Sequence, residues 1–227
     1  MDLKDFRAVI FDLFHTLTSL ESVRAPGRGT SEILGVSRKE WNKQLLLYSE
    51  DRLRGKIRDP LEIIRKMARA INPDVSDEII RQAVNNRIKR FKYVLEHIDP
   101  GTIITLARLR ASGKLIGLIS NGDLSEIAGW KNSPIKKYFD SVVFSCDVGY
   151  IKPEKEIYEI CLKKLGVLSH ECVFVGDGGC GELRGAKELG MTTVLTTHVI
   201  KIIWPEKIKE NRKYADYEID ELKELLE

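Results

Sequence analysis

The residues best suited to chemistry in this 227-residue sequence each follow a short apolar run. In chain order they are Asp12, Ser120 with Asn121, Lys152, and Asp177 with Glu182. A carboxylate such as Asp12 can attack an electrophilic phosphorus or carbon and form a covalent intermediate that water then hydrolyses. Asp177 and Glu182 supply the hard oxygen ligands that Mg²⁺ prefers. Ser120 can donate to a phosphoryl oxygen and Lys152 can neutralise developing charge, so the set predicts Mg²⁺-assisted phosphoryl transfer.

The apolar runs that precede these residues are typical of buried strands. They lie at residues 8–11, 115–119, 141–144 and 172–175. Segments with helical spacing of apolar residues separate them, for example after Gly101 and after Pro153. Strands that alternate with helices favour a parallel sheet. In such sheets the ligand crevice lies beyond the carboxyl ends of the strands, where these polar residues fall.

One long stretch interrupts the alternation, because residues 19–95 contain helical periodicity and no strand-like run. Pro60 and Pro73 divide this stretch into several helices. We therefore expect a helical module inserted after the first strand. The predicted division is a core of residues 1–18 and 97–227 and an inserted helical domain of residues 19–96.

The four elements together resemble the haloacid dehalogenase superfamily of hydrolases. They are Asp12-Leu13-Phe14-His15-Thr16-Leu17, Ser120-Asn121-Gly122, Lys152-Pro153, and Gly176-Asp177 followed by Glu182. The resemblance implies a doubly wound, Rossmann-like α/β core with a helical cap domain, and a closing strand and helix between Ala215 and Leu226. It also implies that the backbone carbonyl of Phe14 joins Asp12, Asp177 and Glu182 around Mg²⁺. Thr16 would support the first loop.

Several of these residues also have simpler interpretations. Asp177 could cap the helix that follows it, and Glu182 could be a first-turn acid that interacts with the helix dipole. Asn121 could contribute to binding or only shape its turn, because Asn tolerates the left-handed backbone conformation. Four polar loops at four strand ends in one order are nevertheless hard to produce by turn chemistry alone, which favours a catalytic role.

The first motif departs from the phosphatases of the family at Phe14, where they carry a second Asp. That Asp protonates the leaving group and then activates water. Loss of a general acid and base typically lowers rates by about 100- to 10,000-fold, so activated esters should react best. His15 has a side chain of suitable pKa for the missing role if its ring reaches the leaving oxygen, and otherwise it has a packing or cap-hinge role.

Phe14 also raises the alternative of a 2-haloacid dehalogenase, since those enzymes carry an aromatic residue there and use no metal. The segment from Trp41 resembles their cap helix, but Asn42 stands where they have the Arg that holds the halide. Arg38 or Lys43 would have to substitute. The two acids of the fourth loop suit a metal better than a carboxylate substrate, so the dehalogenase is the second hypothesis.

Two further interpretations are weaker. Residues 176–181 match the GxGxxG dinucleotide fingerprint, but the span 195–203 has no acid for a ribose. The chain could also be a ligand-binding protein that has lost turnover, although the nucleophile and its partners are all present. His97, His170 and His198 have no partner pattern and are expected to be structural or exposed.

Composition limits the remaining possibilities. The chain has 37 basic and 34 acidic residues and a net charge of +3, which gives no electrostatic case for nucleic acid. No run approaches the length of a membrane span and the start has no export signal, so we expect a cytoplasmic protein. The four cysteines lack a CxxC pair and are expected to be buried and reduced. A small phosphorylated metabolite is the expected partner, and the cap could support a homodimer.

Overall fold

A parallel sheet forms the centre of the computed structural model, which describes residues 2–18 and 25–227. Its strand order is β3-β2-β1-β4-β5-β6, and each neighbouring pair is parallel. The strands are β1 (Ala8–Phe11), β2 (Leu115–Ser120), β3 (Ser141–Phe144), β4 (Cys172–Gly176), β5 (Thr192–Thr196) and β6 (Tyr217–Ile219). The chain winds outward from β1 in one direction and then, from β4, in the other. This order is the doubly wound α/β fold that the sequence predicts.

Helices cover both faces of the sheet. They are α7 (Pro100–Ala111), α8 (Ser145–Val148), α9 (Lys155–Leu165), α10 (Glu182–Glu188), α11 (Ile200–Ile203) and α12 (Pro205–Asn211). Val9 and Phe11 of β1 lie in a core with α7, whereas Ala8 and Ile10 lie in a second core with α9 and α10. Burial on both faces explains why the strands consist of continuous apolar residues instead of alternating ones.

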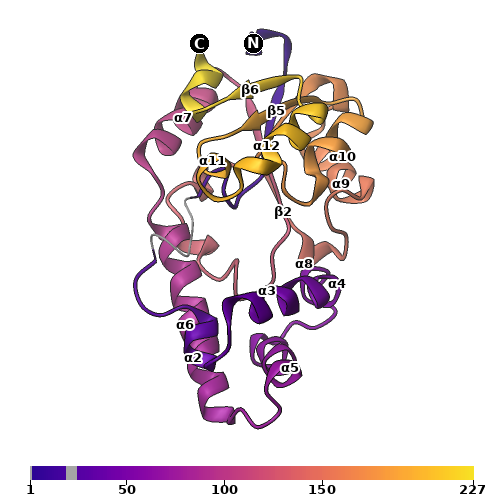
Figure 1. Ribbon diagram of the computed structural model, residues 1–227. Helices are drawn as coiled ribbons and strands as arrows, with labels where there is room; N and C mark the ends of the chain where they lie inside the picture. The colour runs from indigo at the N-terminus through magenta and orange to yellow at the C-terminus, as the bar shows by residue number, and fades with distance from the viewer. Residues whose placement is uncertain (1, 19–24) are drawn as a thin grey trace.

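Short 3₁₀ helices complete the core. They are η1 (Leu3–Asp5), η2 (Trp130–Asn132), η3 (Lys136–Tyr138), η4 (Ser169–Glu171), η5 (Gly179–Gly181), η6 (Arg212–Tyr214) and η7 (Leu222–Leu226). The last of them stands where the family resemblance implies a closing helix, after β6 as the closing strand. Both chain ends lie at the same end of the molecule (Figure 1).

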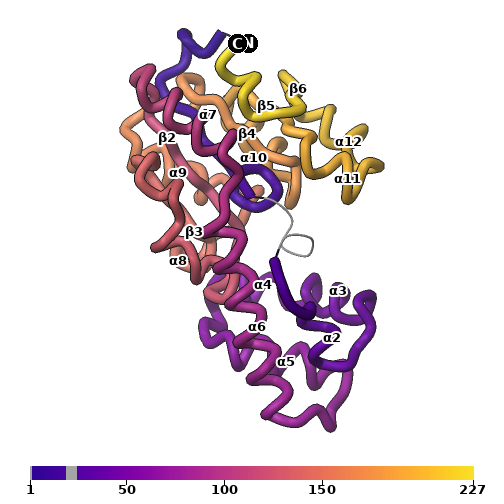
Figure 2. The backbone as a smooth tube through the Cα atoms, turned by 90° about the vertical axis from the view of Figure 1, so that its left-hand side faces the viewer, coloured from indigo at the N-terminus to yellow at the C-terminus, as the bar shows by residue number. Residues whose placement is uncertain are grey.

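The predicted helical insertion between β1 and β2 is confirmed. Its described helices are α2 (Thr30–Leu34), α3 (Arg38–Leu47), α4 (Ser49–Leu53), α5 (Pro60–Ile71) and α6 (Asp77–Glu96). They pack around a core of their own that includes Trp41, Ile64 and Met67. Asp59 and Ser76 cap the first turns of α5 and α6. The insertion forms a lobe beside the carboxyl ends of the strands, and α6 runs from its far end back to the core (Figures 1 and 2).

Two expectations from the sequence need correction. Strand β5 was missed because its sequence, Thr-Thr-Val-Leu-Thr, is too polar for an apolar run. It is a strand because β4 and β6 pair with it on either side, with Val194 and Leu195 fully buried. The expectation of four buried cysteines is wrong for Cys180, which is exposed in η5, whereas Cys146, Cys161 and Cys172 are buried.

Among the described residues, no helix combines the length and apolar character needed to cross a membrane.

Candidate active site

The predicted acidic residues meet at the carboxyl ends of β1 and β4. Asp12 follows β1 directly, Asp177 follows β4, and Glu182 is the first residue of α10. All three side chains are buried, and one carboxylate oxygen of each lies within 4.8 Å of the others. Residues separated by up to 170 positions thus form one cluster, because parallel strands bring their carboxyl ends to the same edge.

The ammonium of Lys152 lies inside this acidic cluster. It forms ion pairs with Asp12 and with Glu182, and the lysine is only 3% exposed. Burial alone would lower the pKa of Lys152, but the two carboxylates outweigh that effect and raise it. Lys152 is therefore a fixed positive charge beside the proposed nucleophile.

The carboxylates outnumber the positive charge that Lys152 supplies. Burial raises the pKa of Asp12, with a further increase from Asp177, and burial followed by Asp12 raises that of Glu182. Burial opposes ionisation of Asp177 as well, but His15 and the amide of Gly179 keep its pKa below the ordinary value. A divalent cation bound by the three carboxylates would offset the excess negative charge, so the donor set fits Mg²⁺.

One buried hydroxyl group beside this cluster has unused hydrogen-bonding capacity. Within the described part of the chain, Ser120 Oγ has no hydrogen-bond partner, and the residue is fully buried, with 0% exposure. Thr16 is equally buried, and its hydroxyl interacts with the Asp12 carboxylate. Because buried polar atoms are normally paired, the Ser120 hydroxyl fits a site where a ligand or water supplies the partner. Ser120 ends β2, next to β1, where a phosphoryl group attacked by Asp12 could accept its hydrogen bond.

Asn121 connects two of the predicted motifs. Its Nδ2 donates to the carbonyl oxygen of Lys152 at 3.2 Å, and its Oδ1 accepts from the Lys152 amide at 2.9 Å. Both side-chain groups of Asn121 thereby hold the backbone from which the Lys152 side chain extends. This contact favours a positioning role for Asn121.

Glycines allow the loop between β4 and α10 to present its acids. Glu182 Oε1 accepts from the Gly178 amide at 3.0 Å, and Asp177 Oδ1 accepts from the Gly179 amide at 2.8 Å. A Cβ on Gly176 would lie only 2.1 Å from Glu182 Oε1. The space over the GxGxxG segment is therefore taken by an acidic side chain, which disfavours the dinucleotide hypothesis.

Phe14 and His15 point to different neighbours. The Phe14 ring packs edge-on against Phe91 of α6, with centroids 5.6 Å apart. His15 has a left-handed φ of 66°. Its Nδ1 lies 3.6 Å from Asp177 Oδ2, and the centroid of its ring lies 5.4 Å from that of Trp204. The predicted proton-transfer role of His15 and the carbonyl ligand from Phe14 stay predictions.

The other histidines fit the expectation of structural or surface roles. His97 and His170 are exposed, and the His198 ring lies 2.9 Å from the Thr196 hydroxyl.

Sequence reasoning missed a second group of buried charges, between the insertion and the core. Arg52 and Arg87 of the insertion pair with Asp123 and Glu126, which lie just after the Ser120 loop. The Asp-x-x-Glu spacing could have flagged a capped turn at residues 123–126. No spacing rule relates that turn to arginines so far away in the sequence.

Apart from Phe14, the residues relevant to the dehalogenase hypothesis lie within the insertion. Trp41 is 4% exposed and belongs to the core of the insertion. Asn42 and Arg38 line a cavity of about 380 Å³ that Arg87 and Arg90 also line. Arg38 thus lies near Asn42, but Lys43 does not line this cavity.

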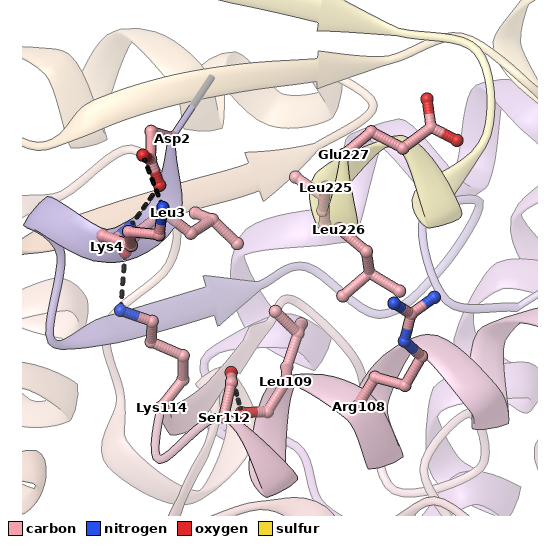
Figure 3. Close-up of a pocket in the computed structure, with 10 residues that line it drawn as sticks. All are labelled: Asp2, Leu3, Lys4, Arg108, Leu109, Ser112, Lys114, Leu225, Leu226 and Glu227. Carbon is pink, nitrogen blue, oxygen red and sulfur yellow. Dashed lines mark hydrogen bonds and ion pairs between the residues drawn. The ribbon is translucent and has the colours of Figure 1, made fainter.

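A larger cavity, of about 700 Å³, lies away from the catalytic residues (Figure 3). Its lining combines η1 near the N-terminus, the end of α7 and the C-terminal residues Leu225, Leu226 and Glu227. This position is at the amino ends of the strands. The cavity therefore has no part in the chemistry of Asp12.

Comparison with known proteins identifies the family of this chain. The chain matches the haloacid dehalogenase-like hydrolases over residues 6–190. A glyceraldehyde 3-phosphate phosphatase of Methanocaldococcus jannaschii is 37% identical over 131 residues, which are 56% of this chain and 54% of that protein. The match therefore spans about half the length of that relative.

Solved structures extend the likeness to nearly the whole chain. A dehalogenase has a TM-score of 0.66 at 21% identity, covering 98% of this chain and 96% of its own. A HAD family enzyme from Bacteroides thetaiotaomicron, in complex with magnesium and inorganic phosphate, has a TM-score of 0.60 at 21% identity and covers 84% and 94%. These structures share the fold.

The fold and the family match define a hydrolase with an α/β core and a helical insertion. The chain belongs to the haloacid dehalogenase-like hydrolases.

Proposed function

We propose that this chain is a Mg²⁺-dependent phosphatase that hydrolyses a small phosphorylated metabolite through an aspartyl-phosphate on Asp12. The observation that carries the proposal is the buried cluster of Asp12, Asp177 and Glu182 around Lys152. The phosphatase from Methanocaldococcus jannaschii supports the substrate class, and glyceraldehyde 3-phosphate is the first candidate to test.

In the proposed reaction a carboxylate oxygen of Asp12 attacks the phosphorus atom. The bond from phosphorus to the ester oxygen breaks, and the leaving group takes that electron pair and a proton. Water then attacks the phosphorus of the aspartyl-phosphate, which restores Asp12 and releases inorganic phosphate. Bound Mg²⁺ would supply positive charge that reduces repulsion between the nucleophile and the phosphate.

The remaining residues bind and orient the phosphoryl group. Ser120 Oγ donates to a phosphoryl oxygen, and the Lys152 ammonium favours the ionised form of Asp12 and neutralises charge in the transition state. Thr16 supports the loop of the nucleophile, and Asn121 positions Lys152. We further propose that residues 19–96 act as a cap over a core of residues 1–18 and 97–227, and that the cap selects the substrate.

The proton for the leaving group has no obvious donor, because Phe14 replaces the second Asp of the family motif. We propose His15 for this role.

Substitution of His15 by Asn keeps a residue that tolerates the left-handed backbone. Hydrolysis of an alkyl phosphate should then fall at least about tenfold, with a smaller loss for an aryl phosphate, whose leaving group needs no acid. Equal losses for both substrates would exclude His15 as the acid.

The test of the main proposal is hydrolysis of an activated aryl phosphate with and without Mg²⁺. Phosphate release should require Mg²⁺, and Asp12→Asn should lower it at least about a thousandfold while the fold is retained. Phosphate release that persists in Asp12→Asn, or that does not respond to Mg²⁺, would contradict the mechanism.

The second candidate is a 2-haloacid dehalogenase, favoured by the aromatic residue at position 14 and by Arg38 beside Asn42. Chloride release from 2-chloropropionate without metal would establish it. If both substrates remain unreacted while inorganic phosphate still binds, the chain is a ligand-binding protein of the same fold.

A further inference from the structure

Four buried charges join the helical insertion to the core. Arg52 Nη1 of α4 donates to Asp123 Oδ2 at 2.9 Å and to Glu126 Oε1 at 3.0 Å. Arg87 Nη2 of α6 donates to the same Glu126 oxygen at 2.6 Å, and Arg87 Nε donates to Ser125 Oγ at 3.1 Å. We call Arg52, Arg87, Asp123 and Glu126 the interlobe cluster.

The ion pairs of the interlobe cluster can form only while the insertion and the core are in contact. Arg52 and Glu126 are each 9% exposed, Arg87 6% and Asp123 1%. Two positive and two negative charges balance within it. Buried charges are costly unless paired, so loss of either arginine leaves carboxylates uncompensated. Movement of the insertion away from the core would have the same effect, unless water enters the gap.

The carboxylates of the cluster also shape the loop that follows Ser120. Glu126 Oε2 accepts from the Asp123 amide at 2.9 Å, and Asp123 Oδ1 accepts from the Ser125 amide at 2.9 Å. The same two side chains therefore bond to the insertion and fold the loop. The loop is anchored at its start by the Gly122 amide, which donates to Ser145 Oγ at 3.1 Å.

The cluster also adjoins the nucleophile loop. A Cβ on Gly122 would lie 3.5 Å from the Phe14 ring and 3.7 Å from Glu126 Oε2. The Arg87 guanidinium lies over the Phe91 ring, with Cζ 4.7 Å from the ring centroid, and the Phe91 ring packs against that of Phe14. Charge pairs and aromatic contacts thus link α6 both to the loop of Ser120 and to that of Asp12.

We propose that Arg52 and Arg87 are positioning residues that couple the seating of the insertion to the conformation of residues 120–126. When the insertion is seated, both arginines hold Asp123 and Glu126, and the loop presents the Ser120 hydroxyl. Only the catalytic consequence rests on the proposed phosphatase function. The coupling between lobe contact and loop order is independent of it.

Arginine geometry provides the conservative variants. Arg52 bonds to both carboxylates through the single nitrogen Nη1, which lies one atom beyond the position of a lysine Nζ. Arg52→Lys and Arg87→Lys keep the net charge and lose these shared bonds. Ser125→Ala is milder, since it keeps all four charges and removes only the hydroxyl that bonds to Arg87 and to Asp123. The matched control is Arg69→Lys, because Arg69 pairs with Asp77 on the exposed surface of the insertion.

The experiment is hydrogen exchange of the full chain with Mg²⁺, in the absence and presence of inorganic phosphate. Without phosphate, Arg52→Lys and Arg87→Lys should raise amide exchange across residues 121–126 at least about tenfold, and Ser125→Ala less, while Arg69→Lys changes nothing there. In the wild type, phosphate should slow exchange in α4 and near Arg87, because coupling is reciprocal. Arg52→Lys should abolish that response.

Kinetics with an aryl phosphate separate positioning from simple stability. We expect kcat to fall about tenfold in Arg52→Lys with KM changed less than about threefold, because the contact orders Ser120 for the transition state. Unchanged exchange in residues 121–126 in both arginine variants would overturn the proposal, as would an equal rise across every segment of the chain. If phosphate does not bind the wild type, the phosphatase proposal fails, but the phosphate-free exchange still decides the coupling.

Discussion

The hydroxyl of Ser120 has a proposed role in binding and no internal partner that would contribute to folding. It is fully buried, and no described residue forms a hydrogen bond with its Oγ. A buried polar atom without a partner does not stabilise the folded state. In the proposed function a phosphoryl oxygen supplies the partner.

Substitution of Ser120 by Ala should therefore separate activity from stability. We expect aryl phosphate hydrolysis to fall by about 100- to 1,000-fold, because a donor to the phosphoryl group is lost. The free energy of unfolding should change by less than about 1 kcal/mol, since no internal hydrogen bond is broken. Ser133→Ala is the control, because Ser133 Oγ is also buried and unpaired but lies outside the predicted motifs. A large stability loss in Ser120→Ala alone would show that Ser120 has a structural partner.

The protonation of the acidic cluster predicts how Mg²⁺ binding depends on pH. The pKa values of Asp12 and Glu182 are raised, chiefly by burial, so protons compete with the metal above the ordinary carboxyl range. Mg²⁺ affinity should rise with pH by up to about tenfold per unit for each proton released. Calorimetry in two buffers of different ionisation enthalpy measures the released protons directly. An affinity that is constant between about pH 5 and pH 8 would contradict the raised pKa values.

At the scale of elements, the turn from β4 into α10 determines where the proposed metal ligands lie. A Cβ on Gly176 would lie 2.1 Å from Glu182 Oε1, so a larger residue there would have to displace the Glu182 carboxylate. Glu182 is 1% exposed, and the Gly178 amide and the Lys152 ammonium both hold that carboxylate. The packing of this turn and the proposed binding of a metal therefore depend on the same contact.

Gly176→Ala should displace Glu182 and weaken Mg²⁺ binding at least about tenfold, with a loss of about 1–3 kcal/mol in stability from overpacking. Titration with Mg²⁺ and thermal unfolding measure the two effects. Gly29→Ala is a suitable control, because its Cβ would meet nothing closer than 3.7 Å. Normal Mg²⁺ affinity in Gly176→Ala would remove Glu182 from the proposed ligands.

At the scale of the whole molecule, the insertion and the core meet through complementary charges. Arg54 of the insertion donates to Glu154 at 2.8 Å, and Arg58 donates to Asp147 at 2.9 Å. Between these pairs the chain passes Gly55, whose φ is +68° and whose Cβ would lie 2.2 Å from the Cys146 carbonyl oxygen. Close backbone contact and paired charges hold the lobes together over the candidate site.

Gly55→Ala should therefore separate the lobes. The matched control is Gly35→Ala, which shares the left-handed φ, +66°, but has nothing within 4 Å of its Cβ. Both variants should lose about 1–2 kcal/mol from backbone strain. Only Gly55→Ala should increase the radius of gyration in small-angle scattering and the rate of proteolysis between the lobes. An unchanged radius would show that the contact at Cys146 does not hold the lobes together.

Much of the fold could be predicted because the relevant signals are local. Four of the strands appear as continuous apolar runs, since a sheet covered on both faces favours apolar residues in its strands. The helical insertion is evident from periodicity alone. Strand β5 was missed because Thr192, Thr193 and Thr196 are polar, and only pairing with β4 and β6 makes them part of the sheet.

The order and chemical type of the groups at the strand ends follow from local patterns, because Asp12, Ser120 and Asp177 directly follow or end their strands. The position of the Lys152 ammonium between Asp12 and Glu182, and the contact of Arg52 with Asp123, are visible only in the folded molecule. Arg52 and Asp123 are 71 positions apart, and no sequence spacing pairs residues over such a distance. The ion pair forms because of the way the insertion packs on the core, which no local pattern encodes.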